Sequence, residues 1–463
     1  MKDVFKGQNL VKVATALFAA VLLLSVFIFQ FGVTDNGELT NRLIHLGLYD
    51  SQGASGSGEF ATKFGVSGGI AGFTTADIPY AIGKLFHPVD TNISVFIPAA
   101  IYCILLILGV YLIIKNLISD IEWNNILLAA ICILIFADTA YTSFLNTPYT
   151  NAAQFSYCIF MVGSFVWTLK SGKVPAFIIA GISAFLFAGT SKITAWVAII
   201  IAGYFLKLVF DNRELLKKIL CVVFALSTIL TSVLTLYFAP VDEAKLYNSI
   251  FYGVALNDAN EAVKLGVDEQ SASLLAGKPA FEEQAQEYLN SVVLTDKVSS
   301  ANVSMHYLKN PSLFVKNIKQ VAMNSTSIST DYLGNYRYAS GKGFGVTRFF
   351  KLYSTIKRRI LPANLFMSLV ILFGMAVGSV FYRKKYAADK SAKQICDLTL
   401  TGVVSALIAF VLPLIYGGLA QIGFNMFLYN LLFDLCLVSA VVGGTKLLWI
   451  RREALKEKYG VNQ

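Results

Sequence analysis

The sequence predicts an all-α polytopic membrane protein with about ten transmembrane helices and a large, mostly helical loop outside the membrane. Of its 463 residues, 56% are hydrophobic and only 14% are charged, whereas soluble domains carry about 25% charged residues. The apolar residues gather in runs close to the roughly 20 residues that a helix needs to cross the hydrocarbon core. The lipid bilayer is therefore the expected surroundings of most of the chain.

Ten apolar runs are long enough to be candidate spans. They cover 11–33, 94–115, 125–144, 149–169, 174–190, 193–210, 218–239, 362–382, 397–417 and 424–449. Only residues 189–192 separate the fifth run from the sixth, so these two form either a hairpin or one broken unit, and the expected count is about 9–11 spans. The first run is too long for the apolar core of a signal peptide and is expected to remain as an anchor.

The distribution of positive charge predicts that both termini lie in the cytoplasm. Lys2, Lys6 and Lys12 precede the first run or open it, and most other basic clusters then fall in cytoplasmic loops and in the C-terminal tail. Such loops of membrane proteins are rich in Lys and Arg. This bias accounts for the net charge of +10. We therefore expect a multi-pass protein of the bacterial plasma membrane with no nucleic-acid partner.

Two long segments, 34–93 and 240–361, are then predicted to lie outside the membrane. The second is too long and too mixed in pattern for a disordered linker, and its first part predicts short helices with Asp242 and Asp258 as caps. The expected organisation is an N-terminal transmembrane module over 1–239, a loop domain over 240–361, and C-terminal transmembrane helices with a cytoplasmic tail over 362–463.

The first outer loop opens with polar residues at the membrane exit. Asp35 and Glu38 follow a helix end, and Asn36 with Gly37 predicts a turn. A carboxylate at a partly desolvated interface can have a raised pKa and act as a general base. Arg42 can bind a phosphate through two hydrogen bonds. The alternative is an ordinary polar helix flank with a local ion pair.

Further candidates lie at the outer ends of later runs. Asp138 is near the outer end of the third run, where ionisable groups are costly and usually functional. Asn146 and Tyr149 follow in the next turn. Lys192, after Ser191, lies between two apolar runs and can pair with a lipid phosphate. A lysine that merely extends toward the interface is the alternative for Lys192.

The end of the second outer segment combines aromatic and basic residues. Asn335, Tyr336 and Arg337 precede a glycine-rich stretch at 340–345, and a basic, aromatic-rich run follows at 348–359. Aromatic faces stack on sugar rings, and Arg and Lys neutralise phosphate. The alternative is an amphipathic helix on anionic lipid, and both interpretations can hold together.

Metal and nucleotide chemistry find little support in the sequence. The three histidines are scattered and form no HExxH motif, the six cysteines form no CxxC pair, and no P-loop is present. We therefore expect no zinc site, no redox centre and no ATPase.

The order of these motifs resembles that of GT-C-type polytopic glycosyltransferases, and in particular of the bacterial WsfD-type hexose transferases of glycan biosynthesis. The resemblance covers about residues 10–380. It rests on Asn36-Gly37-Glu38, on Asp138, Tyr141, Asn146 and Tyr149, on Ser191-Lys192, and on Tyr332-Leu333-Gly334-Asn335-Tyr336. Glu38 replaces the aspartate that is common in the family, and Asn151 stands where a glutamate is expected.

The resemblance implies a GT-C-like fold and a hexosyltransferase that uses a polyprenyl-phosphate sugar on the outer leaflet. An acidic residue of the first loop would activate the acceptor hydroxyl or help to hold a divalent cation, which is the one cofactor to consider. The acceptor would be a cell-envelope polysaccharide or a teichoic-acid-like polymer. The catalytic candidates are Glu38, Asp35 and Asp138, and the substrate-binding candidates are Arg42, Asn36, Tyr149, Asn146, Lys192, Asn335, Tyr336 and Arg337.

Two other functions stay open at this point: a transporter or flippase of lipid-linked glycan, and an assembly partner whose site has decayed. Transporters place ionisable residues near the midplane and have repeated halves, whereas the polar candidates here gather at the outer ends of the helices. Asn151, where a glutamate is expected, is compatible with an assembly partner that has lost its activity. If the site is real, Glu38, Asp138 and Lys192 should line one outward-facing cavity.

Overall fold

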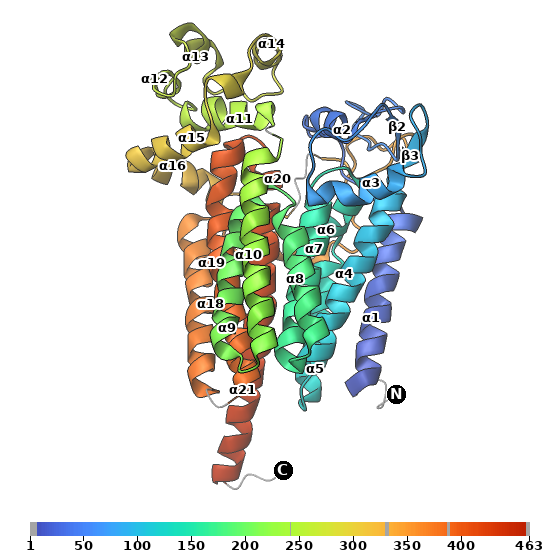
Figure 1. The fold of residues 1–463 in the computed structure, drawn as a ribbon, viewed down its shortest axis with the longest axis vertical. Coiled ribbons are helices and arrows are strands. Elements are labelled where there is room, and N and C mark those ends of the chain that lie inside the picture. Colours follow the sequence, from blue (N-terminus) through green and yellow to red (C-terminus); the bar gives the residue numbers. More distant parts are fainter. Residues whose placement is uncertain (1–6, 241, 329–332, 387–388, 460–463) are drawn as a thin grey trace.

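The computed structural model describes residues 7–240, 242–328, 333–386 and 389–459, with side chains as far as Arg452. Lys2, Lys6 and Tyr332 lie outside the described residues. Long helices run side by side as a bundle, and most of the two long loop segments gather at one end of it (Figure 1). We call this the loop end. The opposite end, where the described chain begins and finishes, is the termini end.

The bundle is built from helices that match the ten apolar runs. Within the described ranges, eight helices are long and apolar enough to cross a membrane: Gly7–Ile28 (α1 with its π-helical end η2), α4 (Phe96–Leu117), α7 (Asn151–Ser171), α9 (Lys192–Asp211), α10 (Leu215–Phe238), α18 (Leu365–Lys385), α19 (Lys390–Gly417) and the part of α21 (Phe427–Tyr459) up to Arg452. The helix α5 (Glu122–Phe136) with α6 (Thr139–Thr142) and η4 (Ser143–Asn146), bent by 45°, is either a ninth, broken span or a re-entrant loop. α8 (Val174–Ala188) is apolar but has only 15 residues. The prediction of an all-α polytopic membrane protein is confirmed.

Small residues let two central helices approach closely. A Cβ at Gly163 of α7 would lie 2.4 Å from the carbonyl oxygen of Gly109 in α4. Membrane helices gain little from the hydrophobic effect in lipid, so close contact of this kind supplies much of their association. α7 is consequently the most enclosed span, with 83% of its apolar window buried, and the core of the bundle lies around it.

A short break separates α8 from α9, so the fifth and sixth apolar runs are two helices and not one broken unit. Ser191 caps α9, because its hydroxyl accepts a hydrogen bond from the Thr194 amide at 3.2 Å. The carbonyl of Gly189 accepts from the Thr75 amide at 2.9 Å. The break therefore lies against the first outer loop, and Lys192 begins α9 at the loop end.

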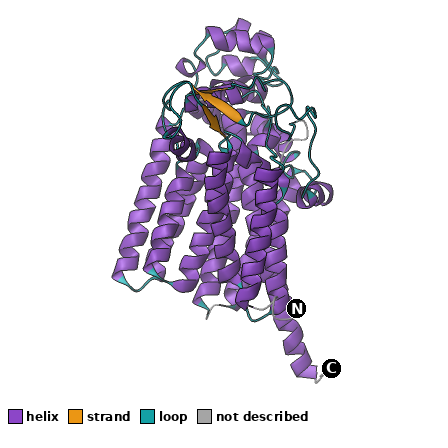
Figure 2. Ribbon diagram, turned by 90° about the vertical axis from the view of Figure 1, so that its right-hand side faces the viewer, coloured by secondary structure: helices purple, strands orange, loops and turns teal. Residues whose placement is uncertain are grey.

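The first outer loop carries a small antiparallel sheet that lies over part of the loop end (Figure 2). Its strands pair in the order β1 (Leu48–Tyr49), β2 (Lys63–Val66), β3 (Asn92–Ser94), with Leu48 opposite Val66 and Lys63 opposite Ser94. The helices α2 (Leu39–Leu46), η3 (Thr75–Asp77) and α3 (Ile78–Lys84) flank the sheet.

The second outer segment is mostly helical, as predicted. Its helices are α11 (Glu243–Ser249), η5 (Ile250–Val254), α12 (Asn260–Val263), α13 (Glu269–Leu275), α14 (Glu283–Ser291), η6 (Leu294–Asp296), α15 (Ser300–Lys309), α16 (Pro311–Ala322) and α17 (Leu352–Ile360). The expected cap at Asp242 is confirmed, because its carboxylate accepts from the amides of Ala244 and Lys245 at 3.1 and 3.3 Å. Asp258 likewise accepts from the Asn260 amide at 3.0 Å, just ahead of α12.

The end of this segment is locked onto the first loop. The Gly32 amide donates to the Asn335 carbonyl at 3.0 Å. The Glu59 carboxylate accepts from the Ser340 hydroxyl at 2.6 Å and from the Lys342 amide at 2.9 Å. These hydrogen bonds lower the pKa of Glu59 to about 2, and the bond from Ser340 has the largest effect. The end of the second outer segment is thus packed against the first outer loop.

α17 is held to the bundle by its polar face. The Lys357 ammonium lies 2.6 Å from the Asp434 carboxylate of α21, and the two side chains are 1% and 0% exposed. The hydroxyls of Tyr141 and Tyr353 donate to the same carboxylate, each at 2.6 Å. A buried ion pair is tolerated when its remaining hydrogen-bonding capacity is filled in this way.

Candidate functional site

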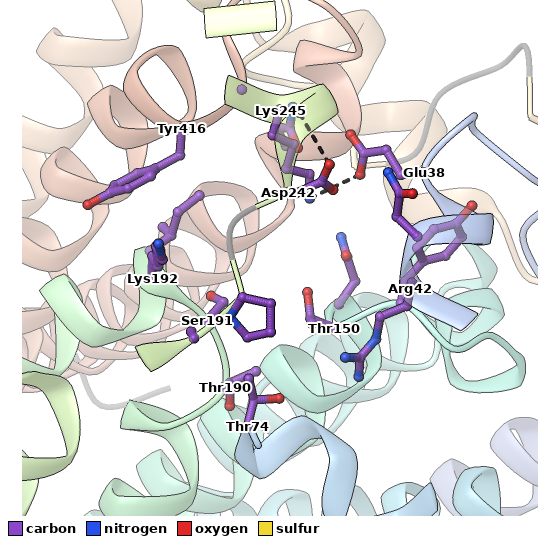
Figure 3. A pocket seen from close by; sticks show the side chains of 18 of the residues that line it. Glu38, Arg42, Thr74, Thr150, Thr190, Ser191, Lys192, Asp242, Lys245 and Tyr416 are labelled. Atoms are coloured by element: carbon purple, nitrogen blue, oxygen red, sulfur yellow. Dashed lines mark hydrogen bonds and ion pairs between the residues drawn. The ribbon is translucent and has the colours of Figure 1, made fainter. Parts of the chain in front are cut away.

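A cavity of about 240 Å³ opens at the loop end, where α2, α9 and α11 meet the ends of α7 and α19 (Figure 3). Its polar lining comes from residues far apart in the sequence. They are Glu38, Asn41, Arg42, His45, Thr74, Tyr149, Thr150, Asn151, Gln154, Thr190, Ser191, Lys192, Asp242, Lys245, Ser300, Tyr416 and Asn425. Of the predicted site residues, the structure brings Glu38, Arg42, Tyr149 and Lys192 together here.

Glu38 is a nearly buried carboxylate in the wall of this cavity. It precedes α2, and its side chain is 7% exposed. The Oε2 atom of Glu38 lies 3.0 Å from Nζ of Lys245. Lys245 belongs to the first turn of α11, whose N-cap is Asp242. Burial raises the pKa of Glu38 above its ordinary value, while the Lys245 ammonium acts in the opposite direction. The result is a carboxylate that is more basic than an exposed one.

The turn before Glu38 is held by Asn36 and Asp35. Tyr149 donates its hydroxyl hydrogen bond to Oδ1 of Asn36 at 2.7 Å, and Asn36 donates to the Gln421 side chain at 2.7 Å. Oδ1 of Asp35 accepts from the Gly37 amide at 2.7 Å. Asn36 and Asp35 are outside the cavity lining, so the geometry gives them the task of placing Glu38.

Arg42 shares a buried carboxylate with His45. An Nη atom of Arg42 lies 2.6 Å from Asp77, and Nε2 of His45 lies 2.9 Å from the other oxygen of the same group. The Thr74 amide also donates to Asp77 at 2.6 Å. Burial alone would raise the pKa of Asp77, but Arg42 and His45 hold it well below its ordinary range. The charge of Arg42 is therefore neutralised inside the cavity wall.

Replacing Asp77 by Asn should destabilise the protein by about 3–5 kcal/mol, because the buried Arg42 charge would lose its partner. The pKa of Asp77 is lower in the folded chain than in the unfolded one, so its stabilisation is complete above about pH 3.8 and is lost as the pH falls toward the folded value. Thermal unfolding in detergent measures both effects. Asp90→Asn, at an exposed loop carboxylate, is the matched control. Equal unfolding curves for the two variants would contradict the assignment.

Lys192 lies on the side of the cavity across from Glu38 (Figure 3). It is the first residue of α9 and makes no ion pair with any described residue. The start of a helix also carries a partial positive charge. Lys192 is thus a cavity-lining cation whose charge is left uncompensated.

Asp138 does not share the cavity with Glu38 and Lys192, contrary to the geometric expectation. It is fully buried and accepts hydrogen bonds from the amides of Ala140 and Ser354 at 2.8 and 2.9 Å, and from the Ser354 hydroxyl at 2.8 Å. Asp138 caps α6 and holds α17. Its carboxylate is used within the fold because a buried charge needs such donors.

The other predicted binding residues also lie outside the cavity lining. Asn146 donates two hydrogen bonds of 2.8 Å to carbonyls at the end of the first span. Asn335 donates to a carbonyl of the same region at 2.9 Å, and Arg337 donates to a nearby glutamine at 2.7 Å. Tyr336 stacks under Lys342, whose Nζ is 4.2 Å from the ring centre. These residues join the outer segments to the bundle.

Several cavity residues were missed in the sequence. Lys245 and Asp77 carry charge into or beside the site, and Gln154 donates to Ser191 at 3.2 Å. Tyr416, at the far end of the chain, accepts from the Trp196 indole at 2.8 Å. Each lies alone in its local sequence, so no motif or spacing distinguishes it from an ordinary polar residue.

A divalent cation does not fit the cavity as it is arranged. The carboxylates in its lining are Glu38 and Asp242. The first is paired with the Lys245 ammonium, and the second caps α11. Across the described ranges, no three His, Cys, Asp or Glu side chains are grouped so that they could hold a metal ion. We therefore derive no step through a metal.

The bundle and its charged cavity define a polytopic membrane protein with a candidate site at one membrane face. The sequence matches the family described as the YfdI N-terminal transmembrane domain over residues 2–461, and the chain belongs to this family. No curated protein matches the sequence.

Two solved structures are similar in shape at low sequence identity. One is the Archaeoglobus fulgidus oligosaccharyltransferase in its apo form, with a TM-score of 0.41 and 12% identity over 98% of this chain and 52% of that one. The other is AglB from Archaeoglobus fulgidus in complex with an inhibitory peptide and a dolichol-phosphate, with a TM-score of 0.40 and 14% identity over the same shares. The chain spans about half the length of these structures.

Proposed function

We propose that this protein is a GT-C-type membrane glycosyltransferase, which transfers a hexose from a polyprenyl-phosphate donor to a cell-envelope polysaccharide or teichoic-acid-like acceptor at the extracytoplasmic face. One observation carries the proposal: a nearly buried carboxylate, Glu38, faces Lys192, a cation that makes no ion pair with the described residues, across one cavity. A sugar transfer with a phosphate leaving group needs these two groups, a base for the acceptor and a positive charge for the phosphate.

In this mechanism, Glu38 takes the proton from the acceptor hydroxyl. The hydroxyl oxygen then forms a bond to the anomeric carbon, and the bond from that carbon to the phosphate oxygen breaks. Lys192 stabilises the negative charge that builds on the departing lipid phosphate. We propose that attack and departure occur on opposite faces of the sugar, as the resemblance to GT-C enzymes implies, which inverts the anomeric centre.

The size and chemistry of the cavity support a single sugar as the transferred group. Its volume of about 240 Å³ is just below the roughly 300–1,000 Å³ of most ligand pockets. Asn41, Thr150, Asn151 and Gln154 supply uncharged polar groups to its lining, which suit the hydroxyls of a hexose. Asn151, where the resemblance leads us to expect a glutamate, thus still contributes a polar side chain to the cavity.

The proposal is tested with the purified full chain in vesicles that contain a radiolabelled polyprenyl-phosphate hexose. We expect label to pass to an added cell-envelope acceptor. Transfer of the label to the other leaflet without formation of a glycosidic bond would establish a flippase instead. Absence of both activities with every hexose and acceptor class tried would favour an assembly partner.

A further inference from the structure

A second and larger cavity lies inside the bundle, toward the termini end. Its volume is about 730 Å³, and its walls come from α4, α5, α7, α9, α18, α19 and α21. It shares no lining residue with the cavity around Glu38. On α21 the lining runs from Leu432 to Leu447, which corresponds to about 22 Å along the helix at 1.5 Å per residue. That length exceeds the roughly 15 Å depth of one leaflet of hydrocarbon.

The walls are apolar and leave open space in front of several glycines. A Cβ atom added at Gly374 or Gly378 of α18, or at Gly444 of α21, would meet no atom within 4 Å. All three glycines line the cavity. Ser405 of α19 also lines it, is 1% exposed, and its hydroxyl has no hydrogen-bond partner among the described residues. Gly374 and Gly378 are exposed, so the space opens between the helices toward the bilayer, and its largely apolar lining does not suit water.

The rim of the cavity at the termini end carries charges of both signs. Lys170 and Lys446 supply ammonium groups, and Asp120 and Asp389 supply carboxylates, of which Asp389 also accepts a hydrogen bond from the Ala392 amide at 3.1 Å. The ion pairs found among the described residues involve none of these four groups. A headgroup with a phosphate and an ammonium would complement this rim, since each of its charges finds an opposite one.

We propose that this cavity binds a phospholipid with an amino headgroup, of the phosphatidylethanolamine class, from the leaflet at the termini end. Its acyl chain fills the apolar space along α18 and α21, and its phosphate and ammonium pair with the charged rim. The site is independent of the proposed sugar transfer, because it shares no lining residue with the cavity around Glu38 and its charged rim lies at the termini end.

The test uses the full chain in vesicles of phosphatidylethanolamine and phosphatidylglycerol. A trace of phosphatidylethanolamine with a photoactivatable diazirine in its acyl chain labels the protein, and mass spectrometry locates the labelled peptides. Gly378→Leu places a side chain in the open space. We expect it to lower labelling of α18 and α21 by roughly tenfold, because overfilled sites bind poorly.

Two further variants keep the result interpretable. Gly444→Leu fills the same cavity from the α21 wall and should lose labelling as well, so that local misfolding of α18 alone cannot account for both losses. Gly203→Leu is the matched control, because a Cβ at this exposed α9 position also meets no atom within 4 Å and the residue is outside the cavity lining. It should label like the parent chain.

Three outcomes would overturn the proposal. The first is equal labelling of Gly378→Leu, Gly203→Leu and the parent chain. The second is labelling that polyprenyl phosphate competes away and phospholipid does not, which would assign the cavity to an isoprenoid chain. The third is equal labelling by a phosphatidylglycerol probe, with no change in Lys446→Gln, which would remove the headgroup assignment.

Discussion

Glu38→Gln should reduce the rate of sugar transfer by roughly 10²–10⁴-fold, because the amide cannot accept the proton of the acceptor hydroxyl. Gln keeps the size of the side chain and can still accept a hydrogen bond from Lys245, which now lies 3.0 Å from the carboxylate. Binding of the donor lipid should change much less than the rate. Single-turnover transfer of labelled hexose, measured beside donor binding, separates the two effects.

Asp35→Asn provides the comparison, because Asp35 is the rival base in the sequence. Its carboxylate oxygen accepts from the amides of Gly37 and Leu39 at 2.7 and 3.3 Å, and asparagine keeps an oxygen for this task. We expect most of the activity to survive in this variant. Unchanged transfer in Glu38→Gln, together with a large loss in Asp35→Asn, would make Asp35 the base and leave Glu38 without a catalytic role.

The pH dependence of transfer should report the same carboxylate. Glu38 works as a base only when it is ionised, and burial raises its pKa above the ordinary 4.5. Activity should therefore fall as the pH drops through this raised value, at a higher pH than for an exposed glutamate. In Lys245→Gln the fall should move to still higher pH, since Lys245 favours the ionised form. A profile identical to that of the parent chain would argue against the pairing.

Lys192→Gln should lower transfer by roughly 10²–10³-fold, because the leaving phosphate would lose its stabilising charge. Lys192→Arg keeps the charge and should recover part of the activity. The effect should appear mainly in the rate of the chemical step, where the phosphate charge develops, and less in binding of a neutral acceptor. Transfer kinetics at saturating and limiting donor measure this division.

Lys173→Gln is the matched control for Lys192. Lys173 is exposed, precedes α8 at the termini end, and is outside the cavity lining. Its replacement removes one positive charge from the chain without touching the site. Equal activity of the two glutamine variants would show that Lys192 serves the fold or the lipid interface and not the leaving group.

Most of the architecture could be predicted because it depends on local properties. A run of about 20 apolar residues must form a helix in lipid, since backbone groups have no other partners there. All ten runs are helical, although the third is bent and divided into α5, α6 and η4. The Asp242 cap was equally local, because a carboxylate reaches amides two and three residues ahead. The sequence did not decide whether residues 174–210 form a hairpin or one broken unit. The hydrogen bond between Thr75 and Gly189 at this break joins residues far apart in the chain.

The candidate site was only partly predictable. Glu38, Arg42, Tyr149 and Lys192 stood out as polar residues at helix ends, and a helix end is visible in the sequence. Whether such a residue faces a cavity depends on which elements pack against it, and these elements differ from one helix end to the next. The Asp138 carboxylate accepts hydrogen bonds from Ser354 of α17, more than two hundred residues later in the chain, and is therefore not free to face the cavity.

The sequence by itself thus determined the membrane helices, the two long loops and the chemical types available at their ends. The tertiary structure decided that Lys245 pairs with Glu38, that Asp77 neutralises Arg42, and that Lys192 lines the cavity without an ion pair to any described residue. The physical reason is that charge balance in a buried site depends on distances of a few ångströms between separate elements. Local sequence does not encode those distances, and only the packed chain sets them.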